Sequence, residues 1–300
     1  MRDQINNAFQ ELQNYICNRL EMLDGKAFFH EDKWSRGENK GGGRTRVIVR
    51  GELFEKGGVN FSAVHGEVTP MMKKQLGLEG DTFYATGVSI VLHPNHPFIP
   101  IMHMNVRYFE MDNGENYWFG GGIDMTPHYI DKRAAKIFHQ RLKKVCDKFD
   151  DNFYPKFKKW ADDYFFIPHR DETRGVGGIF YDHLQATEKL SKGDLLNFAI
   201  DLGRVFPKLY EEQFNLNIDT HYGDHHMLWR NLRRGRYVEF NLVNDRGTKF
   251  GLQTGGRIES ILMSLPENAS WYYNFIPDKG SPEAETQALL KKDIDWLTIT

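Results

Sequence analysis

A short segment after Pro100 carries residue types that could do acid-base and anion-binding chemistry. Read as a β-strand, it places His103, Asn105 and Arg107 on one face, because successive side chains alternate between the faces. The other face receives an apolar set: Met102, Met104, Val106 and Tyr108. An imidazole can carry a proton, and a guanidinium beside an amide can hold a carboxylate. The pattern predicts a sheet face that binds an anionic substrate.

Three more charged residues stand beside glycines. Asp124 follows three consecutive glycines closely, where burial would raise the pKa of its carboxyl and a neighbouring guanidinium would lower it. Arg174 opens a second glycine cluster and Arg257 directly follows a Gly-Gly pair. A guanidinium beside open backbone suits bidentate capture of a carboxylate. The alternative interpretation is a turn residue for Asp124 and surface positions for both arginines.

Histidines offer a possible metal site. Of twelve histidines, four could converge on a divalent ion if the fold brought them together: His93, His103, His139 and His169. Their spacing matches no recognised ligand pair, and His139 lies beside an apolar helical stripe that is typical of a hydrogen-bonded core histidine. A metal site and a structural network both stay open. The chain has no glycine-rich loop of the dinucleotide or phosphate type, so no nucleotide cofactor is expected.

Composition limits the classes of protein. The chain has 300 residues, 40% of them hydrophobic, and a formal net charge of -2, so no global field favours nucleic acid or an anionic membrane. Only Cys17 and Cys146 are present, which favours a reducing compartment over a disulfide framework. No segment approaches the ~20 apolar residues needed to cross a bilayer. These features predict a soluble cytoplasmic protein.

The periodicity of apolar residues predicts the elements that must position the candidate residues. An amphipathic helix opens the chain through Ile5, Phe9, Leu12, Ile16, Leu20 and Leu23, and a polar, glycine-rich segment covers 30–46. Strands with short connections, which favour antiparallel pairing, are expected over 45–51, 59–65, 82–92, 101–109 and 117–124. Helices are expected from Asp131, over 153–164 and after Ser191 as N-cap. Strands return over 236–243, 249–253 and 257–265, before a helix after Pro282.

The pattern favours a single α+β domain over residues 1–300 with one large sheet.

Seven sequence segments, which occur in the same order as in a known family, give the chain a resemblance to that family over nearly its whole length. They are Phe29–Gly37, Phe54–Ser62, Trp118–Asp124, Asp163–His169, Arg174–Phe180, Arg234–Asn241 and Asp245–Leu265. Through them the sequence resembles the oxygen-dependent coproporphyrinogen III oxidases.

The resemblance implies a large, flat antiparallel sheet covered by helices on both faces, and a homodimer that pairs through the region from Tyr237 to the Gly-Gly-Arg turn. It implies O2-dependent oxidative decarboxylation of two propionates of coproporphyrinogen III to vinyls, giving protoporphyrinogen IX, CO2 and hydrogen peroxide. The electron-rich tetrapyrrole can itself reduce O2, so no organic cofactor is expected.

The resemblance also implies roles for residues at matching positions. Substrate contacts fall on Ser89, Asn105, Val106, Arg107, Gly255, Gly256 and Arg257, with a further carboxylate-binding guanidinium at Arg174. The proton donor falls on His103 and the acid-base carboxylate on Asp124. The ligands of a divalent cation such as Mn2+, proposed for bacterial members, fall on His93, His103, His139 and His169, although some members work without metal.

Two rival functions belong to other classes. A non-haem iron oxygenase would use a His-x-Asp/Glu triplet, and such triplets begin at His30, His65 and His169, about as often as chance predicts. A tetrapyrrole-binding protein without catalysis would need the arginines and aromatic residues but no acid-base pair. The presence of His103 and Asp124 argues against the second rival, and only an activity measurement distinguishes that rival from an enzyme.

Overall fold

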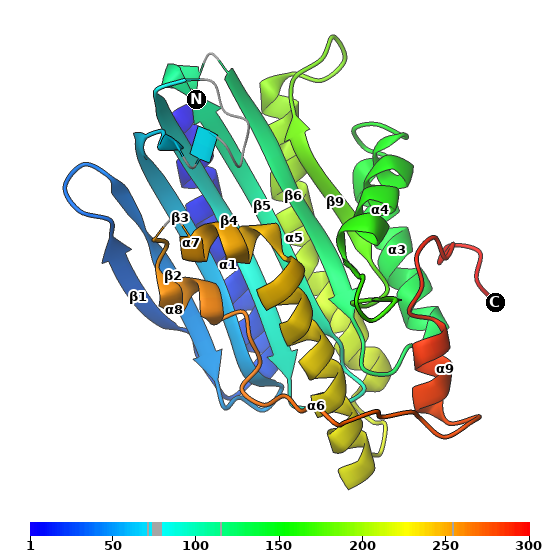
Figure 1. Cartoon of the computed structure of the whole chain (residues 1–300). Helices are drawn as coiled ribbons and strands as arrows, with labels where there is room; N and C mark the ends of the chain where they lie inside the picture. The colour runs from blue at the N-terminus through cyan, green and yellow to red at the C-terminus, as the bar shows by residue number, and fades with distance from the viewer. Residues whose placement is uncertain (71, 74–79, 115, 254) are drawn as a thin grey trace.

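The computed structural model describes all residues except 71, 74–79, 115 and 254. Its centre is a seven-stranded antiparallel sheet in the order β1-β2-β3-β4-β5-β6-β9 (Figure 1). The strands are β1 (His30–Ser35), β2 (Gly41–Val49), β3 (Phe54–Glu67), β4 (Thr82–Pro94), β5 (Ile101–Met111), β6 (Asn116–Thr126) and β9 (Gly178–Leu184). The first six follow one another along the chain, as short antiparallel connections allow, and β9 returns to pair with β6.

Helices cover both faces of this sheet (Figure 1). One face carries α1 (Arg2–Asp24), α3 (Lys132–Cys146), α4 (Phe153–Tyr164) and α5 (Lys192–Asn217). The other carries α6 (Asp224–Glu239), the π-helical turn η2 (Phe240–Asn244), α7 (Arg246–Gln253) and α8 (Ile258–Leu262). Smaller elements are η1 (Asp112–Gly114), β7 (Phe166–Ile167), β8 (Glu172–Thr173) and α9 (Pro282–Ala288). The α+β class and the antiparallel sheet expected from the sequence are confirmed.

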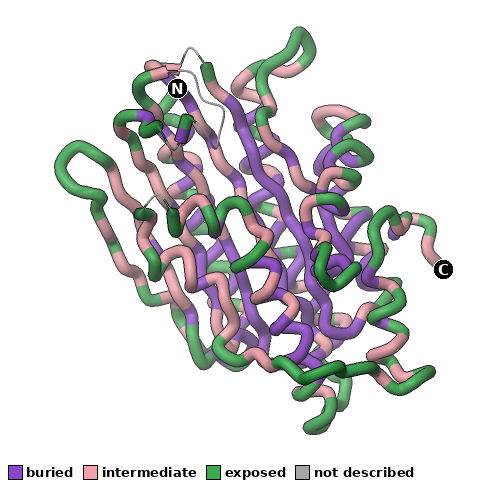
Figure 2. Tube along the Cα trace, in the orientation of Figure 1, coloured by how far each residue is buried: buried purple, intermediate pink, exposed green. Residues whose placement is uncertain are grey.

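The amphipathic patterns explain where the core lies. Along α1 the predicted apolar stripe is buried against β3, β4 and α5, and the helix ends at Gly25, whose φ of 75° suits a left-handed cap. Ser191 is the N-cap of α5, as predicted, and exchanges capping-box hydrogen bonds with Asp194. Figure 2 shows the buried residues concentrated along the central strands. Both cysteines are buried and free.

The alternation predicted for β5 is confirmed. Met102, Met104, Val106 and Tyr108 are buried in the core beneath the sheet, whereas His103, Asn105 and Arg107 are only partly covered on the face beneath α7 and α8. One set of β5 side chains therefore packs in the core, and the other set is available to a site on the opposite face of the sheet. No helix in the described part of the chain is long and apolar enough to span a membrane.

The strands predicted over 236–243, 249–253 and 257–265 are wrong, because these segments form the end of α6, η2, α7 and α8. In these segments the alternation of apolar and polar residues that predicted strands is also compatible with a helix whose buried face carries charged residues. The buried face of α6 includes Arg230, Arg233, Arg234 and Tyr237, and its arginines bond to carboxylates and carbonyl oxygens. A helix that buries guanidinium groups has no apolar stripe to reveal it.

Two strands of the seven-stranded sheet, β1 and β9, were missed because polar residues or glycines surround them in the sequence. The polar segment 30–46 contains β1 and most of β2, paired as a hairpin at the edge of the sheet. β9 was hidden behind the glycine cluster that precedes it. The glycines at 41–43, 57–58 and 120–122 lie inside strands rather than in turns. Gly43 shows why: a Cβ there would lie 2.5 Å from the Trp34 ring, so the residue makes room for that indole.

Candidate active site

A row of directly paired residues crosses the sheet from edge to edge. It runs Asp32, Thr45, Asn60, Ser89, Asn105, Gly122 and Phe180, one residue from each strand. Directly opposite residues in an antiparallel sheet share a face, so this row lies on the side covered by α7 and α8. Its short polar side chains leave space above the strands.

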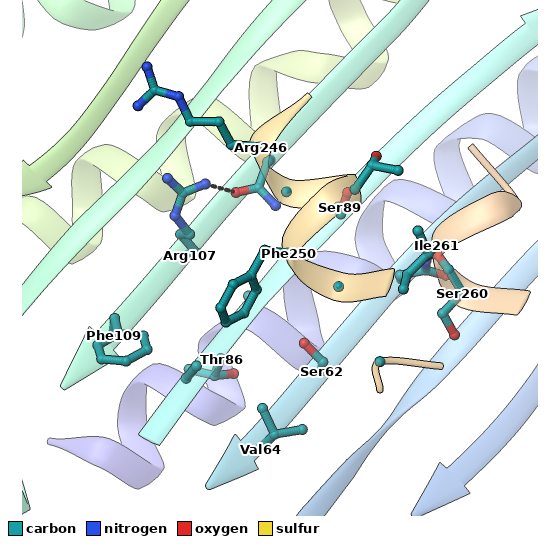
Figure 3. A pocket seen from close by; sticks show the side chains of 18 of the residues that line it. Ser62, Val64, Thr86, Ser89, Arg107, Phe109, Arg246, Phe250, Ser260 and Ile261 are labelled. Atoms are coloured by element: carbon teal, nitrogen blue, oxygen red, sulfur yellow. Dashed lines mark hydrogen bonds between the residues drawn. The ribbon is translucent and has the colours of Figure 1, made fainter. Parts of the chain in front are cut away.

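That space is a cleft of about 2490 Å³, which exceeds the roughly 300–1,000 Å³ of a typical small-molecule pocket. The strands form its floor, and α7 and α8 form its roof. Figure 3 shows Ser62, Ser89 and Arg107 on the strands below Arg246 and Phe250 of α7. A cleft of this size, polar on its floor and lined by aromatic rings at its ends, suits a ligand as large as a macrocycle.

His103 and Asp124 form a hydrogen-bonded pair on this floor. They are direct partners on β5 and β6, and His103 Nδ1 lies 2.7 Å from Asp124 Oδ1. The imidazole keeps 24% of its surface exposed and lines the cleft, whereas Asp124 is 2% exposed. A carboxylate bound to Nδ1 favours the tautomer with its proton on that nitrogen, which leaves Nε2 as a proton acceptor. Asp124 therefore acts on the cleft through His103.

Arg174 holds the other side of Asp124. Its Nη2 donates to both carboxylate oxygens at 2.7 Å, and its Nη1 donates to Asn241 Oδ1 at 2.8 Å. Burial raises the pKa of Asp124, but the Arg174 guanidinium and the His103 hydrogen bond outweigh it and hold that pKa below its ordinary value. Arg174 also lines the cleft, but these two donors already serve Asp124 and Asn241, so its expected role as a substrate anchor stays a prediction.

Arg107 lies farther along β5 on the same floor. Its Nη2 donates to Asp182 Oδ2 at 2.8 Å and its Nη1 to Asn105 Oδ1 at 3.0 Å. The guanidinium is 34% exposed and lines the cleft. Asp182 was not identified from the sequence, because it lies on β9, the strand that the glycine cluster concealed. Arg107, predicted to bind an anion, thus already has a counter-ion in Asp182.

Arg257 approaches the opposite edge of the floor from the roof. It follows Gly255, with φ of 70°, and Gly256, and it is the N-cap residue of α8. Its guanidinium donates to Asp32 on β1 and to Ser260 Oγ at 3.1 Å. The Gly-Gly-Arg turn therefore places another guanidinium in the lining of the cleft, and its predicted contact with substrate stays a prediction.

The remaining predicted substrate contacts divide between the two faces. Ser89 and Asn105 are direct partners on the floor and both line the cleft. The side chain of Val106 is fully buried in the core on the opposite face, so the predicted contact at this position would have to come from its backbone. Neighbouring positions of a strand point in opposite directions, which separates Val106 from its two polar neighbours.

The structure does not bring the four predicted metal ligands together. His139 lies on α3, where its ring nitrogens bond to Tyr154 Oη and the Val176 carbonyl oxygen, each at 3.0 Å. His93 bonds to the Ser264 carbonyl oxygen, and His169 bonds to Glu239. Among the described residues, no three His, Cys, Asp or Glu side chains could hold a metal ion. These histidines do not fit a single divalent cation, and within the described residues none of the three His-x-Asp/Glu triplets belongs to a group that could hold one.

The sequence matches the coproporphyrinogen III oxidase family over residues 4–296. The chain belongs to this family. The match covers the whole sheet, all but the first two residues of α1, the other helices of both layers and every cleft residue named above. A coproporphyrinogen III oxidase acts on a tetrapyrrole that bears carboxylates, and a large cleft with guanidinium groups at opposite ends of its floor agrees with such a substrate.

For a coproporphyrinogen III oxidase, two further cleft residues were missed in the sequence. Asn60 belongs to the polar row and lines the cleft, and its amide donates to the Ser260 carbonyl oxygen at 2.7 Å. Arg246 on α7 also lines the cleft, with its guanidinium 5.7 Å from the Tyr164 ring centre. Asn60 could have been identified from the sequence by following the alternation of side chains along β3. Arg246 required the knowledge that 246–253 is a helix.

Proposed function

We propose that this enzyme converts two propionates of coproporphyrinogen III to vinyl groups in an O2-dependent oxidative decarboxylation, giving protoporphyrinogen IX. For each propionate, the carboxylate carbon leaves as CO2 and the methylene carbon attached to the pyrrole ring loses a hydrogen with its two electrons, so a vinyl group forms. O2 takes up the two electrons and two protons and becomes hydrogen peroxide. One propionate, one O2 and one proton thus give one vinyl, one CO2 and one H2O2, so atoms and charge balance. The His103–Asp124 pair on the cleft floor is the observation that carries this proposal.

Carboxylate binding falls to the cations of the cleft. Arg107 and Arg257 lie toward opposite ends of the floor, and Arg246 lies on the roof. Bidentate guanidinium contacts would fix the macrocycle in plane and in rotation, which is the main requirement for bringing one propionate to a proton acceptor. Lys40 and Arg36 at the β1–β2 hairpin add positive charge at the rim.

His103 is the group that handles protons. With its Nδ1 proton held by Asp124, Nε2 is available to accept a proton from a pyrrole N–H or from the reacting side chain. Removal of a pyrrole proton makes the macrocycle easier to oxidise by O2 directly. We propose that His103 rather than Asp124, the expected acid-base carboxylate, takes this proton, because Asp124 is buried behind its two partners. Asp124 and Arg174 instead position His103.

The test is incubation of the purified enzyme with coproporphyrinogen III in air and under argon. We expect protoporphyrin fluorescence after oxidation of the product, and hydrogen peroxide at two equivalents per protoporphyrinogen, in air only. Product formation at equal rate under argon would contradict O2-dependence. Tight binding of the substrate without any product would favour the rival, a tetrapyrrole-binding protein.

We also propose that the enzyme works in the cytoplasm as a homodimer. The two free, buried thiols agree with a reducing compartment. Fractionation of cells that express the untagged chain tests the location.

A further inference from the structure

The ion pair between Arg107 and Asp182 occupies a prepared place on the cleft floor. Arg107 has a glycine partner on each neighbouring strand, Gly87 on β4 and Gly120 on β6. A Cβ at Gly120 would lie 2.5 Å from Asp182 Oδ1 and 2.7 Å from Arg107 Nε. The pair therefore rests directly on the backbone of β6. Asp182 is held in turn by the His183 N–H, which donates to its Oδ1 at 3.0 Å.

The two partners are partly open to the cleft. Arg107 is 34% exposed and Asp182 25% exposed, and both line the cavity. An incoming carboxylate can therefore reach the guanidinium only in competition with Asp182. Arg257, at the other edge of the floor, is likewise paired with a carboxylate, that of Asp32. Arg246 differs, because no described residue forms an ion pair with it.

This arrangement has a cost for substrate binding. Arg107 is already neutralised, so a substrate carboxylate gains only the difference between its own bond and the bond of Asp182. The displaced Asp182 then stands close to the incoming carboxylate, and like charges repel. A neutral residue at position 182 would leave Arg107 free and would bind a polyanion more tightly.

We propose that Asp182 competes with a carboxylate of the tetrapyrrole for Arg107 and exchanges places with it when the ligand binds. In the empty cleft Asp182 holds the guanidinium, and in the complex the tetrapyrrole carboxylate holds it. The exchange moderates the affinity for every ligand that presents a carboxylate at this position, and so permits release of a product that still carries two propionates. This inference rests on the proposed function.

Binding can be measured without turnover by using coproporphyrin III, the oxidised tetracarboxylate, as a fluorescent probe. Four variants are compared at one ionic strength: Asp182→Asn, Arg107→Ala, the double variant and Asp163→Asn. Asp163 is a matched control because it also loses one negative charge, but it pairs with Lys159 and Lys292 outside the cleft. We expect Asp182→Asn to bind the probe roughly three- to tenfold more tightly than wild type, and Asp163→Asn to bind it as wild type does.

The double variant decides the mechanism. Without Arg107 there is no guanidinium to compete for, so adding Asp182→Asn to Arg107→Ala should give much less gain in affinity than it gives alone. An equal gain in both backgrounds would show a general charge effect and overturn the proposal, as would unchanged or weaker binding by Asp182→Asn. Asp182→Ser repeats the test if the Asn variant does not fold.

Failure of the proposed function is recognised separately. If wild type does not convert coproporphyrinogen III in air, the enzymatic assignment fails, whereas the binding cycle still decides whether Asp182 competes for Arg107. If wild type converts the substrate and the cycle shows no coupling, the function stands and the exchange is rejected.

Discussion

Asp124 is surrounded by partners that leave it no direct path to a substrate, and its effect on catalysis must pass through His103. Asp124→Asn keeps the shape but leaves the Arg174 charge unbalanced, and its amide can present a donor to Nδ1, which would place the imidazole proton on Nε2 instead. We expect kcat to fall by about two orders of magnitude or more, with little change in KM. Steady-state kinetics with coproporphyrinogen III measures this split.

The same variant needs a structural check, because an unbalanced buried arginine also destabilises the fold, by about 3–5 kcal/mol when a buried pair is broken. A thermal melt of Asp124→Asn shows whether it is folded at the assay temperature. Near-normal kcat in a folded Asp124→Asn would remove Asp124 and its hold on His103 from the mechanism. A pH profile displaced from that of wild type would support the positioning role, since a merely structural residue does not shift it.

Arg257 is the residue whose loss should act mainly on binding. Arg257→Ala removes one guanidinium from the cleft and leaves Asp32 without its partner, next to a polyanionic substrate. We expect KM to rise about tenfold, which corresponds to about 1.4 kcal/mol, with a smaller fall in kcat. Arg19→Ala, which removes an exposed arginine paired with Glu211, is the control and should leave KM unchanged. Equal KM values for both variants would exclude Arg257 from the site.

At the scale of elements, Glu239 fastens the loop between β7 and β8 to the end of α6. His169, Arg170 and the Trp271 indole all bond to its carboxylate. Burial raises its pKa, but these hydrogen bonds outweigh that effect and lower the pKa of Glu239 to about 2 from an ordinary 4.5. A carboxyl with a depressed folded pKa stabilises the protein above its unfolded pKa, and that stability is lost as the pH falls through the folded value.

The resulting prediction concerns acid denaturation. Between pH 5 and about pH 2, wild type should lose more unfolding free energy than Glu239→Gln, which starts less stable and has no carboxyl to titrate at this position. Urea denaturation at several pH values measures the difference. Glu188→Gln serves as control, because Glu188 is exposed, and its pH dependence should follow wild type. Parallel curves for wild type and Glu239→Gln would contradict the assignment.

The four histidines expected as metal ligands lie on different parts of the fold. His93 is on β4, His103 on β5, His139 on α3 and His169 in the loop between β7 and β8. His139 is fixed on α3 with both ring nitrogens engaged, and burial lowers its pKa to about 3. Such a ring is a structural member of the core. We expect turnover to survive exhaustive dialysis against EDTA at the rate of the untreated enzyme. Loss of activity that Mn2+ restores would contradict this, and metal analysis of the dialysed protein is the control.

Predictability from the sequence varied with the kind of side chain that an element buries. The two faces of β5 were predicted correctly, because Met102, Met104, Val106 and Tyr108 alternate without a break with the polar residues of the other face. α6 was missed, because Arg233 and Arg234 are buried through ion pairs that lie far away in the chain. In the site, His103, Arg107 and Arg257 could be identified by residue type and family resemblance. Asp182 and Asp32, the counter-ions of Arg107 and Arg257, could not be identified as such, since each lies on another strand whose position only the tertiary fold defines.

At the scale of the whole molecule, the roof of the cleft leaves apolar side chains uncovered. Leu242 and Val243 of η2, Leu252 of α7 and Ile258 of α8 are 44%, 55%, 42% and 59% exposed. The region expected to pair two subunits is thus helical rather than a sheet edge, yet it still presents apolar surface in need of cover. A two-fold dimer would bury the same patch on both subunits, and a stable one needs about 1,200–2,000 Å² in total.

We therefore predict that the protein sediments as a dimer at micromolar concentration and that its roof supplies the contact. Val243→Glu together with Ile258→Glu places charge in the apolar patch of both subunits, so the dimer dissociation constant should rise at least tenfold, by about 1.4 kcal/mol or more. Ile218→Glu is the control, because Ile218 is 39% exposed at the end of α5, on the opposite face of the sheet. A wild-type monomer in sedimentation, or equal weakening by Ile218→Glu, would show that this surface is not the interface. Because the same helices carry Arg246 and Arg257, a weakened dimer should also lose substrate affinity, which links assembly to the cleft.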